Sequence, residues 1–82
     1  MTELGNGNAT FVLISADQKY IREVYKKLES DQRVRGIHPL FGQYNLIAKI
    51  YFKTFEEVQS YVSDIESMEG VTETKTLTGS NV

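Results

Sequence analysis

The hydrophobic and polar positions along the chain predict four strands. The first segment is apolar at consecutive positions from Phe11 to Ile14, which is typical of a strand covered on both faces. Two central segments are rich in β-branched and aromatic residues, and the last one alternates threonine with other residues. The expected strands are residues 9–15, 33–41, 44–53 and 71–78.

Two segments between these strands have the period of an amphipathic helix. In each, apolar residues recur three and four positions apart, which places them on one stripe of a helix. Thr54 and Glu57 have the spacing of a capping box before the second helix, and Gly70 is the expected stop after it. The expected buried stripes are Ile21, Val24, Tyr25 and Leu28 in residues 17–29, and Phe55, Val58, Val62 and Ile65 in residues 55–68.

The stretch from Phe41 to Asn45 is expected to be the loop of a hairpin between the second and third strands. Gly42 can adopt a positive φ there. Pro39 cannot donate a hydrogen bond to a neighbouring strand, so the second strand belongs at an edge of the sheet or carries a bulge, with Gly36 contributing. Right-handed crossovers then place the first and third strands in the centre. The expected fold is an α+β, ferredoxin-like βαββαβ sandwich, a four-stranded antiparallel sheet with two helices on one face.

Two helices leave the second face of such a sheet uncovered, yet neither face of the third strand is polar. One face carries Leu46, Ala48, Ile50 and Phe52, and the other carries Ile47, Lys49 and Tyr51. An uncovered apolar face of several hundred Å² is unfavourable on a monomer. The pattern therefore predicts that a second copy covers this face about a two-fold axis.

Composition and charge exclude several classes of function. A chain of 82 residues forms one domain with a marginal core, and nine Lys and Arg against eleven Asp and Glu argue against a nucleic-acid surface. The absence of cysteine excludes disulfides and thiolate metal sites. No apolar run approaches the roughly 20 residues of a membrane span, and the N-terminus lacks a signal-peptide pattern. We expect a cytoplasmic protein without membrane contact, with a disordered leader at 1–8, one domain at 9–79 and a frayed tail at 80–82.

Catalytic and cofactor-binding patterns are absent. His38 is the only histidine, so a histidine metal cluster is impossible and no metal or cofactor is expected. His38 is either a lone acid or base, as in small dimeric α+β-barrel enzymes, or a structural residue of an edge strand. Phe11 and Tyr51 could stack on RNA bases as in an RRM, but the surrounding basic excess is missing. No glycine-rich phosphate loop is present.

The hairpin and the last strand hold groups suited to a small molecule. Gly42, Gln43 and Tyr44 offer backbone N–H groups that can hold a carboxylate, and the amide of Asn45 both donates and accepts. The threonines of residues 71–78 offer hydroxyl groups on one face. An equal alternative is that Gly42 only permits the turn and that the threonines only favour a strand.

Two motifs resemble those of a known family. The segment Phe41-Gly42-Gln43-Tyr44-Asn45-Leu46-Ile47 resembles a G-x-Y/F-D hairpin signature, and Gly70-Val71-x-x-Thr74-x-Thr76 resembles a G-V-x-x-T-x-T segment. Their order and spacing, with one helix between them, resemble the effector-binding domain of the leucine-responsive regulatory protein/AsnC (Lrp/AsnC) family, called the RAM domain. The resemblance covers about residues 9–78.

This resemblance implies a fold, a ligand class and partners. Such domains form a dimeric α+β barrel through their sheets, assemble dimers into larger rings, and bind an amino acid or related metabolite at subunit interfaces. The implied binding residues are Gly42, Tyr44 and Asn45, together with Thr74 and Thr76 of the last strand. The short segment before residue 9 implies a stand-alone form without the helix-turn-helix, which does not bind DNA itself and acts with full-length regulators.

One position departs from the family pattern. The family has Asp where this chain has Asn45, and a carboxylate pairs with an ammonium more strongly than a neutral amide does. Asn45 therefore either shifts the preference toward a differently charged metabolite or only secures the hairpin. An ACT-like amino-acid-binding module is a further alternative with the same strand order.

Overall fold

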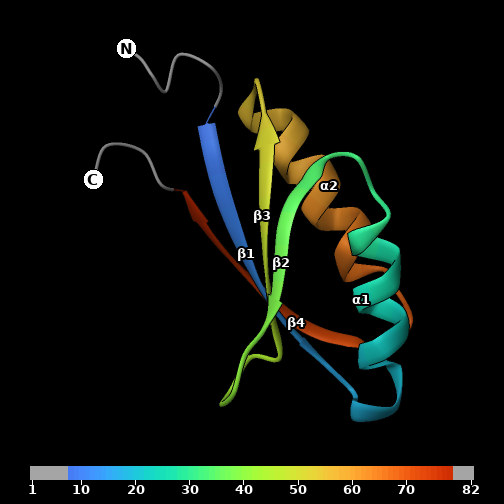
Figure 1. Ribbon diagram of the computed structural model, residues 1–82. Helices are drawn as coiled ribbons and strands as arrows, with labels where there is room; N and C mark the ends of the chain where they lie inside the picture. Colours follow the sequence, from blue (N-terminus) through green and yellow to red (C-terminus); the bar gives the residue numbers. More distant parts are fainter. Residues whose placement is uncertain (1–7, 79–82) are drawn as a thin grey trace.

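The computed structural model describes residues 8–78, which form one antiparallel sheet and two α-helices (Figure 1). In chain order the elements are β1 (Asn8–Ala16), the 3-10 helix η1 (Gln18–Tyr20), α1 (Ile21–Glu29), β2 (Val34–Pro39), β3 (Leu46–Phe52), α2 (Phe55–Glu66) and β4 (Val71–Thr78). The strand order is β2-β3-β1-β4, and Figure 1 shows both α-helices on one side of the sheet. The expected ferredoxin-like topology is confirmed, with β1 and β3 in the centre.

The ends of the elements differ from the expected bounds. The first helical segment begins as η1, which Asp17 caps: its side chain accepts a hydrogen bond from the N–H of Lys19. β2 stops at Pro39 because the backbone N–H of Leu40 turns back to the carbonyl of Asn45 (2.8 Å) and closes the loop. The expected leader, apart from residue 8, and the expected tail at 80–82 lie outside the described residues.

The core lies between the helices and one face of the sheet. Val12 and Ile14 of β1 are fully buried, and they lie opposite Ala48 and Leu46 of β3. Because side chains alternate along a strand, the residues between them lie on the other face. The buried apolar residues are Val12, Ile14, Ala16, Val24, Leu28, Leu46, Ala48, Ile50, Val58, Tyr61 and Ile65.

The expected buried stripe of the second helix is wrong at its first residue. Phe55 is 64% exposed, whereas Tyr61, which is not in the expected stripe, is 2% exposed. The buried face of α2 is Val58, Tyr61 and Ile65. Extended back by one turn, this face reaches Thr54, the residue that caps α2 by accepting a hydrogen bond from the N–H of Glu57. Phe55 therefore lies outside the core, although it lines a groove between α2 and β4.

β2 lies at an edge of the sheet and also carries a bulge, so both of the positions predicted from Pro39 are found. Val34 lies opposite Ile50, but Gly36 lies opposite Lys49, so Arg35 is the additional residue at the shift in register. A bulge of this kind re-aims the side chains around it. In this protein the residue that it re-aims is a cation.

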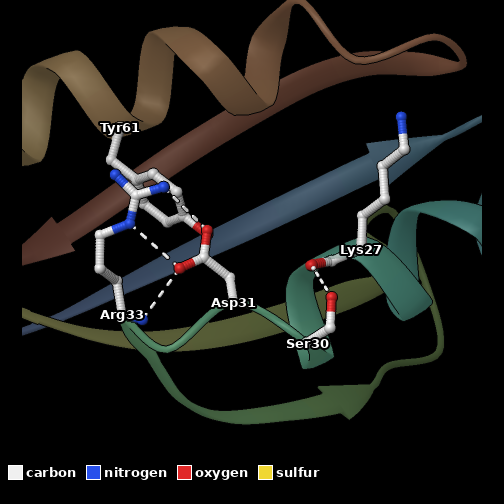
Figure 2. A network of polar contacts seen from close by, with 5 residues as sticks. All are labelled: Lys27, Ser30, Asp31, Arg33 and Tyr61. Atoms are coloured by element: carbon white, nitrogen blue, oxygen red, sulfur yellow. Dashed lines mark hydrogen bonds and ion pairs between the residues drawn. The ribbon is translucent and has the colours of Figure 1, made fainter.

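A polar network joins the turn after α1 to α2 (Figure 2). Asp31 accepts hydrogen bonds from the Nε and an Nη atom of Arg33 (3.0 and 2.9 Å) and from the hydroxyl of Tyr61 (2.9 Å). The guanidinium of Arg33 lies 4.2 Å from the centroid of the Tyr61 ring. The hydrogen bonds from Arg33 lower the pKa of the Asp31 carboxyl from 3.8 to about 2. Asp31 therefore fixes the only buried tyrosine of the described core.

This network predicts a contribution to stability that depends on pH. A depressed carboxyl pKa stabilises the fold above pH 3.8, and this stabilisation is lost as the pH falls toward about 2. Since the pair is partly exposed, we expect Asp31→Asn to cost about 1 kcal/mol at pH 7 and progressively less below pH 4. Urea denaturation of both variants across this range measures the difference. Asp64→Asn, which removes an exposed carboxylate from α2, is the control, and an equal pH dependence for the two variants would contradict the assignment.

Candidate functional site

The expected binding loop is a protruding, exposed hairpin. Gly42 has φ +112°, as the turn requires, and no atom lies within 4 Å of the position its Cβ would take. Phe41 beside it is fully exposed, and Gln43 is exposed as well. Figure 1 shows the loop projecting beyond the sheet, away from the two helices. The loop can therefore contact a ligand or another molecule, but it encloses no pocket by itself.

Asn45 fastens this loop to the end of β1. Its backbone N–H donates to the carbonyl of Ile14 (2.8 Å), and its side-chain Oδ1 accepts from the backbone N–H of Ala16 (2.8 Å). Ala16 lies beyond Ile14, the last residue of β1 that pairs with β3, so the Asn45 side chain takes the place of a strand partner for its N–H. The side-chain oxygen of Asn45 thus has a structural role that a carboxylate oxygen could also fill.

Substitutions at Asn45 separate this structural role from ligand binding. Asn45→Ala leaves the N–H of nearly buried Ala16 unpaired, and we expect a loss of about 1–3 kcal/mol in unfolding free energy. Asn45→Asp keeps the accepting oxygen, so its stability is expected to stay within about 0.5 kcal/mol of the parent at pH 7. Chemical denaturation measures both. Equal losses in the two variants would show that the Oδ1 bond is not the important contact.

Tyr44 connects the hairpin to β4. Its hydroxyl donates to Oε2 of Glu73 (3.0 Å), and this bond to a carboxylate raises the pKa of Tyr44. Glu73 lies opposite Ser15 of β1, on the sheet face that the helices leave open. Sequence reasoning missed Glu73, although its position between Thr72 and Thr74 places it on the face opposite to theirs.

The two threonines expected at the site lie on the helix-covered face instead. Thr74 and Thr76 are opposite Ile14 and Val12, which point into the core. The hydroxyl of Thr74 donates to Oε2 of Glu66 in α2 (2.7 Å). Thr76 lines a groove of about 300 Å³ between β4 and α2, together with Phe55, Val58, Gln59, Val62, Ser63 and Glu66. Within one subunit the structure therefore does not bring the threonines and the hairpin into a single pocket.

The open face of the sheet is apolar but carries more cations than anions. Phe11 and Leu13 of β1 lie on this face. They alternate along the strand with Val12 and Ile14, which are buried beneath the helices. The remaining described side chains on this face are Ser15 of β1, Arg35 and His38 of β2, Ile47, Lys49 and Tyr51 of β3, and Glu73, Lys75 and Leu77 of β4.

Two of these cations flank one aromatic ring. The guanidinium carbon of Arg35 lies 5.8 Å, and Nζ of Lys49 5.4 Å, from the centroid of the Tyr51 ring. A pocket of about 310 Å³ next to them is lined by Phe11, Arg35, Gly36, His38, Ile47 and Lys49. Sequence reasoning missed Arg35 and Lys49 because the whole chain is acidic, with a net charge of −2, and the imbalance is local.

Other kinds of site are not found in the described part of the chain. Residues 8–78 contain no cluster of three or more His, Asp or Glu side chains that could hold a metal ion. None of the helices in this range is long and apolar enough to span a membrane. His38 lies on the exposed edge strand, opposite Ile47, and lines the pocket of the open face.

Comparisons with known proteins identify relatives over nearly the whole chain. The family model of the Lrp/AsnC ligand binding domain matches residues 9–78. An uncharacterised HTH-type transcriptional regulator of Pyrococcus abyssi, PYRAB04820, is 33% identical over 63 residues, which are 77% of this chain and 43% of that protein. The chain thus spans about half the length of the curated relatives that it matches.

Solved structures give the same fold. TTHA0845 from Thermus thermophilus superposes with a TM-score of 0.84 at 28% identity, over 92% of this chain and 95% of that one. A Neisseria meningitidis transcriptional regulator, NMB0573, in complex with L-Met superposes with a TM-score of 0.80 at 18% identity, over 95% of this chain and 55% of that one. The first match covers nearly all of both chains, whereas the second covers only part of the longer Neisseria chain.

Proposed function

Since this chain belongs to the Lrp/AsnC ligand-binding domain family, we propose that its function is to sense an effector. It binds an amino acid or a related small metabolite where subunits meet, and binding shifts the equilibrium between assemblies. A coupling of about 1–3 kcal/mol is enough for such a shift to matter. The domain catalyses no reaction and does not itself bind DNA; its partners are full-length regulators of the same family.

The observation that carries this proposal is the apolar open face of the sheet. Phe11, Leu13, Ile47, Tyr51 and Leu77 lie on it, and Leu77 is 43% exposed in the single subunit. Each 400 Å² of apolar surface covered by a partner supplies about 10 kcal/mol before the costs of association. That is comparable with the total stability of a domain of this size, about 4–12 kcal/mol. A second copy, packed face to face, is therefore the proposed state.

The proposed effector site lies at a boundary between such subunits. Gly42 and Gln43 are exposed, and Thr74 and Thr76 lie on the opposite face of the sheet from the Tyr44–Glu73 hydrogen bond. A ligand that contacts both groups therefore needs a second subunit to complete its pocket. The L-Met complex of the Neisseria regulator supports an amino acid as the class of effector.

Light scattering in dilute buffer tests the proposed dimer. We expect a particle of twice the 9.3 kDa chain mass, and we expect Leu13→Glu to dissociate it because two carboxylates would be buried at the interface. Gln59→Glu adds the same charge to an exposed position of α2 and should leave the dimer intact. A folded particle of 9.3 kDa for the parent chain would overturn the proposal.

A thermal-shift screen against the amino acids tests the ligand. A ligand with a Kd of about 10 µM adds about 2.7 kcal/mol at 1 mM, enough for a clear rise in Tm. We expect Tyr44→Ala to abolish the rise, while Lys26→Ala, at an exposed position of α1, preserves it. The absence of any shift for the parent chain would contradict the amino-acid class.

A further inference from the structure

We propose that Arg35 and Lys49 form a binding site on the open face for a small organic anion. The expected ligand has a carboxylate or phosphate group and an apolar body, and it lacks an ammonium group. The site itself exists in a single subunit, whereas its coupling to dimer formation rests on the proposed function. It is separate from the hairpin residues Gly42 to Asn45 considered above.

The first step is the position of the two cations. Arg35 is the additional residue of the β2 bulge, and its guanidinium lies over the same Tyr51 ring as the ammonium of Lys49. Among the described residues neither cation takes part in an ion pair; the one pair found there is Arg33–Asp31. Two cations beside one ring repel each other unless an anion lies between them. Arginine and lysine together provide several donors for carboxylate or phosphate oxygens.

The second step is the composition of the adjoining pocket. Its volume of about 310 Å³ is at the lower end of the range for small-molecule sites. Phe11 and Ile47 supply apolar walls, and Gly36 leaves room because a Cβ there would meet only the Cβ of Lys49, at 3.9 Å. No carboxylate lines this pocket. An amino acid would therefore leave its ammonium beside like charges, whereas the corresponding 2-oxo acid would not.

The third step is the charge of the whole open face. Arg35, Lys49 and Lys75 lie on it, and the one carboxylate among its described residues, Glu73, accepts a hydrogen bond from Tyr44. Face-to-face packing of two copies brings six cations together, and unpaired buried charges disfavour association. A bound anion in each copy offsets this repulsion. The anion therefore favours the dimer over the monomer.

Titration calorimetry with phenylpyruvate and with inorganic phosphate tests the site. We expect saturable binding of at least one probe, and the two arms separate a carboxylate ligand from a phosphate ligand. Arg35→Gln and Lys49→Gln should each weaken binding at least tenfold. Lys75→Gln is the matched control, because it removes a cation from the same face outside the pocket, and it should change the affinity less than threefold. Phenylalanine should bind at least tenfold more weakly than phenylpyruvate.

Several results would overturn the site. They are no binding of either probe at 10 mM, equal losses in Lys75→Gln and Lys49→Gln, or equal affinity for phenylalanine and phenylpyruvate. Light scattering at constant ionic strength, with chloride replaced by the probe, measures the coupling, and we expect a lower dimer dissociation constant with the probe. A stable dimer that binds neither probe would refute this site alone, whereas a probe-binding monomer would refute the proposed function and leave the site standing.

Discussion

Replacement of Gly70 by alanine is expected to lower the unfolding free energy by about 2–5 kcal/mol. Gly70 has φ +95°, which costs an L-residue about 1–2 kcal/mol, and a Cβ added there would clash with the Cβ of Tyr20. The clash is with the base of the Tyr20 side chain, which cannot move without its backbone. The carbonyl of Gly70 also accepts a hydrogen bond from the N–H of Asp17 (2.7 Å). A shift of the backbone at Gly70 would therefore disturb the start of η1.

Gly42→Ala is the matched control for this substitution. Gly42 also has a positive φ, +112°, but nothing lies within 4 Å of its virtual Cβ. Its expected loss is the conformational cost alone, about 1–2 kcal/mol. Urea denaturation of both variants isolates the contribution of the Tyr20 contact. If Gly70→Ala were no worse than Gly42→Ala, the close packing of η1 on the α2–β4 turn would be refuted.

Leu28→Ala is expected to destabilise the domain by about 2–5 kcal/mol. Leu28 is fully buried in α1 within the single core between the helices and the sheet. Truncation removes apolar burial and leaves a cavity that the surrounding strands fill only in part. A domain of 82 residues has a total stability of about 4–12 kcal/mol, so this loss is a large share of it.

Phe55→Ala provides the comparison for Leu28→Ala. The hydrophobic period alone assigns Phe55 to the buried stripe, but its side chain is 64% exposed. The expected loss is below about 1 kcal/mol, as is usual for surface positions. Thermal and urea denaturation rank the two variants. A loss at Phe55 as large as that at Leu28 would contradict the orientation of α2.

The topology was predictable because it depends on patterns within short segments. The consecutive apolar residues of β1, the glycine at position 42 and the proline at position 39 each act through local geometry. The orientation of α2 was not fully predictable. Phe55, the first residue of the helix, fits the apolar period whether or not its side chain is buried against the sheet. Phe55 lies one position after the cap Thr54, and only the packing of the helix shows that its side chain is exposed.

The candidate site depends on pairings that the sequence does not state. The threonines of β4 share a face, as alternation predicts, but the register of β4 against β1 turns Thr74 and Thr76 toward α2. The partner of Asn45 is the N–H of Ala16, 29 positions away. The position of Arg35 beside Tyr51 depends on the bulge in β2. Each of these facts becomes visible only when strands distant in sequence are aligned.

The central place of β1 in the sheet has a consequence for biosynthesis. Of the four strands of this sheet, β1 is made first, and it pairs with β3 on one side and with β4, residues 71–78, on the other. One edge of β1 therefore stays unpaired until β4 has been made, and the pairing that completes the sheet joins its first and last strands. Translation that stops before residue 71 should yield a nascent product with an open apolar edge, a substrate for chaperones and proteases.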